Sequence, residues 1–319
     1  MNKVNIEDIN KYIQGYNIFI CSSSFEDRCL EVANHVEISQ FDKILVCHFK
    51  DNYQESNNNL CKLHEKFGDK CDVILLEKDS PLNNYDAIYD RLLGITFEKA
   101  LLDISTFTRE IFLIIIKLFN QDLFKDRILT MVYNPSDKYS NVSKDDYDKL
   151  WLSKGVKEIR TVVGYAGDFS PIKKDLLIVL VGFEAERSQV LIDNFEAECL
   201  YIGKAPKEES ANEELASINE LNFEMLLRNN PSAQRFDFSC KDIDFSIHAI
   251  SEIVQAHTRD YNIIISPMCN KISTLAAAAV TYKHPEVQIC YASTNLYNTI
   301  AYSTPTNNIY IIEASELYN

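Results

Sequence analysis

The feature that most constrains the fold of this chain is an internal repeat. Residues from about 15 to 165 and from about 174 to 313 form two diverged copies of one pattern. Each copy alternates short apolar runs with stretches of helical periodicity, an order that is typical of βαβ units and a parallel sheet. A period this long indicates two domains rather than a solenoid of short repeats.

Five apolar runs in each copy predict five strands. The segments between them suit right-handed helical crossovers, which cover both faces of a sheet. The strands are expected at residues 17–21, 43–48, 72–76, 99–104 and 127–132, and again at 175–181, 198–202, 234–238, 261–265 and 287–292. The predicted fold class is α/β, with two tandem Rossmann-like units of mainly parallel sheet, flanked by helices and related by internal duplication.

The boundary between the units is predicted from turn chemistry. We expect the first unit at residues 1–165 and the second at 174–319, joined by the glycine- and proline-containing segment 164–171. Residues 145–163 are expected to close the first domain. A polar stretch at about 204–232 is predicted to be an insertion in the second unit, either a helical excursion or a lid.

Charge and cysteine content limit the partners and the compartment. The chain has 32 basic and 47 acidic residues, a formal charge of −15, which disfavours extended nucleic acid as a partner because a duplex needs a broad basic face. A local pocket with a few cations can still bind a small anion. No apolar run reaches a membrane span, no signal peptide opens the chain, and nine cysteines without a C-x-x-C spacing indicate reduced thiols in a cytoplasmic protein.

Three sequence matches carry the duplication. Residues 24–28 match 182–187 after the first strand, 103–109 match 266–271 after the fourth, and 133–140 match 297–303 after the fifth. The offset is 158 between Phe25 and Phe183 and 164 between Tyr133 and Tyr297. The matched residues lie in turns, at the carboxyl edge of the expected sheet where ligands bind in open α/β folds.

The chemistry of these turns suits an anionic ligand. Hydroxyl and amide groups with a cation at a helix N-terminus bind phosphate well, and arginine grips phosphate through two donors. The predicted ligand-binding residues are Ser24, Arg28, Ser105, Thr106, Arg109 and Asn134 in the first copy, and Arg187, Ser266, Asn270, Lys271 and Asn298 in the second. Glu26 and Glu184 are the candidates for acid–base catalysis.

Each of these residues also has a structural interpretation. The Ser, Thr and Asn side chains would equally serve as helix caps. Glu26 with Arg28, and Glu184 with Arg187, would equally pair with each other across a turn. The Tyr-Asn motif after the fifth strand would equally pack around that strand.

Other catalytic and cofactor motifs are absent from the sequence. The six histidines show no metal-ligand spacing, so no metal is expected. No dinucleotide-binding or P-loop glycine pattern follows a first strand, and no cofactor is expected. Ser22, Ser23 and Ser24 follow a strand as nucleophile candidates, but the sequence places no base beside them.

Two segments, 105–109 and 268–271, resemble the turn after the fourth strand in CARF-type sensor domains. The related SAVED domains of bacterial antiviral systems hold two such units in one chain. The resemblance implies a central pocket for a cyclic or linear oligonucleotide second messenger, formed by both units. Because the two units occupy nearly the whole chain, it also implies a separate protein partner as effector.

Three functional hypotheses follow. The first is a nucleotide-binding sensor in which Arg28, Arg109, Arg187 and Lys271 hold phosphates. The second is a hydrolase that cleaves a nucleotide phosphodiester or glycosidic bond in the same crevice. The third is an interaction module whose retained turns contact a protein, for which the charge of −15 suits a basic partner.

Overall fold

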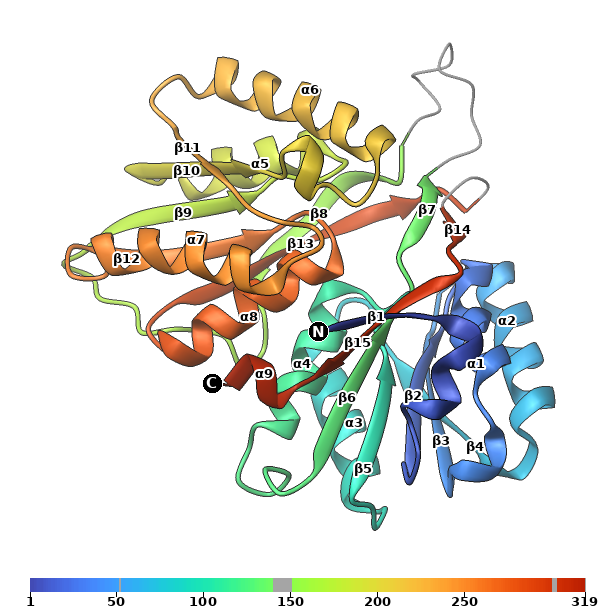
Figure 1. The fold of residues 1–319 in the computed structure, drawn as a ribbon. Coiled ribbons are helices and arrows are strands. Elements are labelled where there is room, and N and C mark those ends of the chain that lie inside the picture. Colours follow the sequence, from blue (N-terminus) through green and yellow to red (C-terminus); the bar gives the residue numbers. More distant parts are fainter. Residues whose placement is uncertain (52, 140–150, 300–302, 319) are drawn as a thin grey trace. The chain divides into compact units, whose positions relative to one another are not determined.

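The computed structural model describes residues 1–51, 53–139, 151–299 and 303–318. These form two compact units, one of Met1–Lys138 with Tyr302–Tyr318 and one of Tyr139–Ala301. Each unit is an α/β layer built on one large sheet with a mainly parallel centre, as the sequence predicts. Figure 1 traces the elements along the chain.

The first unit has a seven-stranded sheet in the order β1-β15-β6-β5-β2-β3-β4. The strands β6, β5, β2, β3 and β4 are parallel, while β15 pairs antiparallel with β6 and β1 pairs antiparallel with β15. The strands are β1 Asn2–Asn5, β2 Ile18–Ser23, β3 Lys43–Phe49, β4 Cys71–Leu76, β5 Lys99–Asp103, β6 Ile128–Tyr133 and β15 Asn308–Glu313. The helices are η1 Ile6–Lys11, η2 Asp27–Leu30, α1 Glu31–His35, η3 Ile38–Gln40, α2 Gln54–Phe67, η4 Gly68–Lys70, α3 Pro81–Leu93, α4 Arg109–Phe119 and α9 Ser315–Tyr318.

The second unit has a six-stranded sheet in the order β11-β10-β9-β12-β13-β8. Its first five strands are parallel and β8 runs antiparallel beside β13. The strands are β8 Ser153–Thr161, β9 Lys174–Leu180, β10 Cys199–Lys204, β11 Gln234–Asp237, β12 Tyr261–Pro267 and β13 Gln288–Tyr297. The helices are α5 Ala185–Phe195, η6 Lys207–Glu209, α6 Glu213–Asn229, α7 Ile243–His257 and α8 Lys271–Lys283.

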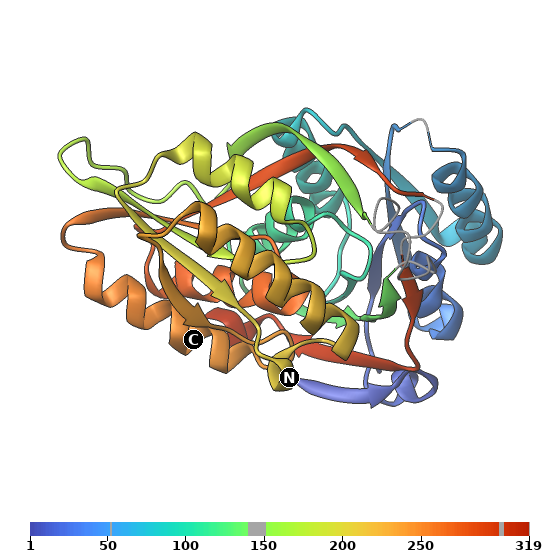
Figure 2. The ribbon, with the colours of Figure 1, turned by 90° about the horizontal axis from the view of Figure 1, so that it is seen from above.

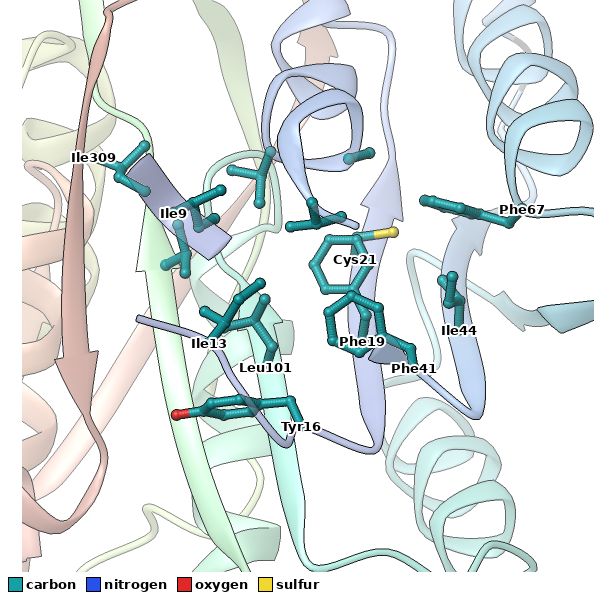
Figure 3. Packing of buried hydrophobic residues seen from close by; sticks show 14 of the residues in the cluster. Ile9, Ile13, Tyr16, Phe19, Cys21, Phe41, Ile44, Phe67, Leu101 and Ile309 are labelled. Carbon is teal, nitrogen blue, oxygen red and sulfur yellow. The ribbon is translucent and has the colours of Figure 1, made fainter. Parts of the chain in front are cut away.

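Buried apolar side chains pack the helices against the sheet in each unit. In the first unit, Phe19 on β2 stacks on Phe41 at 5.5 Å between ring centroids, and Phe67 at the end of α2 meets Phe19 edge-on at 6.1 Å. Figure 3 shows these rings within the buried cluster on this face of the sheet. The helices after the fourth strands, α4 and α8, are buried on almost every side, which agrees with their nearly uniform apolar sequences.

Two strands, β8 and β15, correct the predicted boundary. Residues 145–163 were expected to close the first domain, but β8 pairs with β13 in the second sheet instead (Figures 1 and 2). Conversely, β15, near the end of the chain, pairs with β6 in the first sheet. In sequence, β8 follows the fifth parallel strand of the first unit but joins the second sheet. In the same way, β15 follows the fifth parallel strand of the second unit but joins the first sheet. The linking strands β7 (Ser136–Tyr139) and β14 (Ser303–Pro305) pair in a small separate sheet.

The predicted insertion at 204–232 is the regular crossover between β10 and β11. Its helix α6 packs on β10 and α5, in the place that α2 takes beside β3 in the first unit. The helix has 17 residues, against 14 in α2, so the sequence correctly indicates a longer segment. It is part of the helical layer over the second sheet and not an addition to the fold.

Candidate functional site

The strand order fixes where the carboxyl edge of the first sheet can bind a ligand. β2 lies between β3 and β5, so the crossover after β2 and the one after β5 leave to opposite sides of the sheet. Such a topological switch point is the ligand position in open α/β sheets. At this point the hydroxyls of Ser22 and Thr106 are hydrogen-bonded at 2.8 Å, which joins the two strand ends.

Helix α4 starts beside this contact. Thr108 is its N-cap, and its Oγ1 accepts a hydrogen bond from the amide of Ile111 at 3.3 Å. Arg109 is the first helical residue and is half-buried. The positive end of the helix dipole and the first helical residue, Arg109, therefore lie at the same edge as the Ser22–Thr106 contact, and a helix N-terminus with a cation favours an anion.

The structure contains a second polar contact at this edge that the sequence does not predict. The Oγ of Ser23 and Nδ1 of His48 are 2.8 Å apart, and both residues are buried. Burial lowers the pKa of His48, an effect that the Asp51 charge and the Asn57 side chain oppose. The ring is consequently neutral at neutral pH, and a neutral imidazole beside a hydroxyl is the arrangement that activates a serine nucleophile.

The sequence does not predict His48 as a base for Ser23 because the two residues lie on neighbouring strands. Ser23 and His48 are register partners in the β2–β3 pairing. The sequence shows both residues near strand ends, but the register between two strands depends on their packing in the sheet. A histidine at the end of the second predicted strand was the available signal.

Glu26 and Arg28 form a buried ion pair in the first unit. The Nε and Nη2 of Arg28 donate to Oε2 of Glu26 at 3.2 and 3.0 Å. The side chains of Arg28 and Glu26 are 5% and 6% exposed. Arg28 also donates to the backbone carbonyls of Asn134 at 2.7 Å and Ser105 at 3.1 Å. Ser303, at the start of β14, donates its hydroxyl to the same carboxylate oxygen.

Glu184 and Arg187 repeat this cluster in the second unit. Nη1 of Arg187 donates to Oε2 of Glu184 at 2.8 Å and to the hydroxyl of Ser153 at 3.0 Å. Ser153, at the start of β8, donates its backbone amide and its hydroxyl to the same carboxylate, and Arg187 also donates to the carbonyl of Ala292. Burial works against the charge on Arg187, but the Glu184 carboxylate leaves the pKa of Arg187 raised.

In both clusters the carboxylate accepts a hydrogen bond from a serine hydroxyl on the segment that leads into the exchanged strand, β15 or β8. We name each such group, a Glu, an Arg and a Ser, an edge clamp. The alternative that these Glu and Arg residues pair with each other is therefore the one realised. Arg28 donates twice to Glu26 and Arg187 once to Glu184, and a role of either guanidinium in binding phosphate stays a prediction.

The asparagines after the fifth strands also hydrogen-bond the segments that lead into the exchanged strands. Asn134 is fully buried, and its amide nitrogen donates to the carbonyls of Thr306 at 2.7 Å and Asn308 at 3.3 Å. Asn298 donates its amide to the carbonyl of Trp151 at 2.8 Å. Both side chains thus hold the segment that leads into an exchanged strand, which agrees with the packing interpretation of this motif.

The remaining predicted residues of the first unit support its turns. Ser24 Oγ accepts from the amide of Glu26 at 3.3 Å and is half-buried. Ser105 is buried, and its Oγ accepts from the amide of Asn134 at 2.8 Å. Thr106 is half-buried at the switch point, and its ligand-binding role stays a prediction.

The switch point of the second unit is closed by backbone. A Cβ at Gly182 would lie 2.2 Å from the carbonyl oxygen of Met268, so the turns after β9 and β12 touch directly. Ser266 is fully buried on β12. Asn270 is the N-cap of α8, accepting from the amide of Ser273 at 3.0 Å, and Lys271 is the half-buried first residue of that helix.

The structure therefore divides the predicted residues between the two units. Glu26, Ser24, Arg28, Ser105, Thr106, Arg109 and Asn134 lie in the first, and Glu184, Arg187, Ser266, Asn270, Lys271 and Asn298 lie in the second. Among the described residues, no cluster of three or more His, Cys, Asp or Glu side chains is arranged to hold a metal ion. Nor does any helix in the described ranges have the length and apolar character to cross a membrane.

Comparison with known proteins gives no further assignment. A scan of the chain against models of known protein families finds no match, and a search of curated proteins finds no relative.

Proposed function

We propose that this chain binds a nucleotide-type anion at the carboxyl edge of its first sheet, beside Ser22, Thr106 and the N-terminus of α4. The observation that carries the proposal is the Ser22–Thr106 hydrogen bond, because it places two hydroxyls at the switch point. A ligand phosphate has there a helix N-terminus and the Arg109 guanidinium as binding groups. Cyclic and linear oligonucleotides are the first ligands to test.

The first unit is favoured over the second for a physical reason. In the second unit the backbone of Met268 occupies the space beside Gly182, whereas in the first unit the corresponding turns meet through side-chain hydroxyls. Hydroxyls can exchange a mutual hydrogen bond for one to a ligand, but two backbone segments in contact have to move apart. Asn270 and Lys271 then form a weaker half-site or a support.

We further propose that the two units are diverged copies of one ancestor. Both sheets have the five parallel strands in the same order, and both carry an edge clamp. Both also use an Asn after the fifth strand to hold an exchanged segment. The motifs shared by the copies are thus mostly those that secure the exchanged strands β15 and β8, and the ligand residues are a smaller subset.

The resemblance to CARF and SAVED domains is compatible with this site and gives the proposal its context. We propose a separate protein as the partner of the sensor and antiviral defence in the cytoplasm as its setting. The thiols of all nine cysteines are free, which suits a reducing compartment.

The test is calorimetric titration of the full chain with a panel of cyclic oligonucleotides and mononucleotides. We expect one class to bind, and we expect Arg109→Ala to weaken it at least about tenfold, since charge-assisted hydrogen bonds are worth roughly 1.5–3 kcal/mol. Thr106→Val should weaken it less. Arg91→Ala, which removes a cation from the last turn of α3 where it pairs with Asp72, is the matched control. Absence of binding at millimolar nucleotide would refute the proposal.

A second candidate function, hydrolysis of the bound ligand, is favoured by the Ser23–His48 contact. In this proposal Ser23 and His48 take the place of Glu26 and Glu184 as catalytic candidates, since both carboxylates are held in edge clamps. A fluorophosphonate reagent should label Ser23, and Ser23→Ala or His48→Gln should abolish labelling while Ser22→Ala keeps it. Labelling that is unaffected by Ser23→Ala, or absent from the native chain, would argue against a nucleophilic serine here.

A further inference from the structure

Two buried cysteines of the second unit lie in contact at the carboxyl edge of its sheet. Cys240 follows β11 and precedes α7, and Cys269 follows β12 and precedes α8. Their Sγ atoms are 3.4 Å apart, and the residues are 2% and 6% exposed. β11 and β12 are separated by β10 and β9 in the sheet, so the contact joins turns from strands that do not pair.

The local backbone holds both residues in place. The amide of Cys240 donates to the carbonyl of Glu209 at 2.8 Å, and the side-chain amide of Asn270 donates to the carbonyl of Cys240 at 2.8 Å. Asn219 donates to the sulfur of Cys269 at 3.8 Å. The two sulfurs therefore face each other in a packed setting that fixes their separation, and a shift of little more than 1 Å would bring them to the roughly 2.05 Å of a disulfide.

We propose that Cys240 and Cys269 form a reversible disulfide that locks the turn carrying Asn270 and Lys271. The oxidant is a small-molecule disulfide. The thiolate of Cys269, the more exposed of the two, attacks it and forms a mixed disulfide, releasing one small thiol. The thiolate of Cys240 then attacks the Cys269 sulfur and releases the second. The two cysteine thiols lose two protons and two electrons in total, and the oxidant gains them as two thiols.

The reaction is slow while the unit is closed. The hydrogen bond with Cys269 and burial both raise the pKa of the Cys240 thiol, so little thiolate is present at neutral pH. Formation therefore accelerates with rising pH and with opening of the turns. Once formed, the bond ties the start of α7 to the start of α8. This consequence does not depend on whether a nucleotide binds in the first unit.

The test uses the full chain with Cys61→Ser, which removes the exposed thiol, in a glutathione redox buffer at mildly alkaline pH. Non-reducing peptide mapping is expected to find Cys240 joined to Cys269, with an intact mass lower by two hydrogen atoms. Fluorescence of Trp151, the single tryptophan, is expected to show unfolding of the second unit at higher urea. Dithiothreitol should reverse both changes.

Three variants make the assignment specific. Cys240→Ser and Cys269→Ser should each abolish the cross-link and the urea shift, and Cys199→Ser, on β10 of the same unit, should leave both unchanged. The proposal is overturned if both thiols of the oxidised chain still react with an alkylating agent after denaturation. It is equally overturned if glutathione stays attached to Cys269 without passing to Cys240.

Discussion

Replacement of Arg28 by methionine separates the edge-clamp role of this residue from a ligand-binding role. Methionine keeps the length of the side chain but removes the charge and all donors. Glu26 then stays buried with Ser303 as a hydroxyl donor, and the carbonyls of Asn134 and Ser105 lose their guanidinium partner. Breaking a buried ion pair by removing one partner costs about 3–5 kcal/mol.

Some of this cost should be recovered when the carboxylate is also neutralised. Glu26→Gln in the Arg28→Met background removes the unpaired buried charge, so we expect the double variant to be more stable than the sum of the single losses predicts. Coupling energies of roughly 0.5–3 kcal/mol are usual for residues in direct contact. The pair is only 5–6% exposed, which is why solvent screening does not reduce the effect to that of a surface pair.

Urea denaturation followed by circular dichroism measures these changes. Arg91→Met is the control, since Arg91 pairs with Asp72 with its side chain 41% exposed, and its loss should cost less than about 1 kcal/mol. If Arg28→Met also costs less than about 1 kcal/mol, the buried pair is not formed in solution. Loss of nucleotide binding without loss of stability would then return Arg28 to the ligand site.

Two further predictions concern the carboxyl edges of the two sheets. Burial lowers the folded-state pKa of His48 below its ordinary 6.5, so the unfolded chain binds more protons near that pH. Stability should therefore fall as the pH decreases below about 6.5, and His48→Gln should flatten this dependence of the urea midpoint between about pH 5 and 7. Gly182→Ala should destabilise the second unit by about 1–3 kcal/mol because its Cβ overlaps the Met268 carbonyl. Gly94→Ala, whose Cβ would meet its nearest atom at 3.6 Å, should change the urea midpoint little; equal effects would contradict the closed switch point.

The local sequence determined the five parallel strands of each unit and most of the helices between them, but not β1, β8, β15 or α6. Uninterrupted apolar runs such as 176–181 suit strands buried on both faces, and the capping residues Thr108 and Asn270 mark the starts of α4 and α8. These signals depend on neighbours within a few residues along the chain, so the α/β class and the order of the elements could be predicted. The position of Thr106 and Arg109 at a carboxyl edge followed from the same order.

Only the tertiary structure decided which chain segments meet. The strand at 153–161 joins the second sheet because β13 offers an edge there, and nothing in its own residues names that partner. The same holds for Glu26 with Ser303, and for Ser23 with His48, which depend on contacts between residues far apart in sequence. The repeat was visible in the sequence, but whether a repeated Glu and Arg bind a ligand or each other depends on burial and on the groups that surround them.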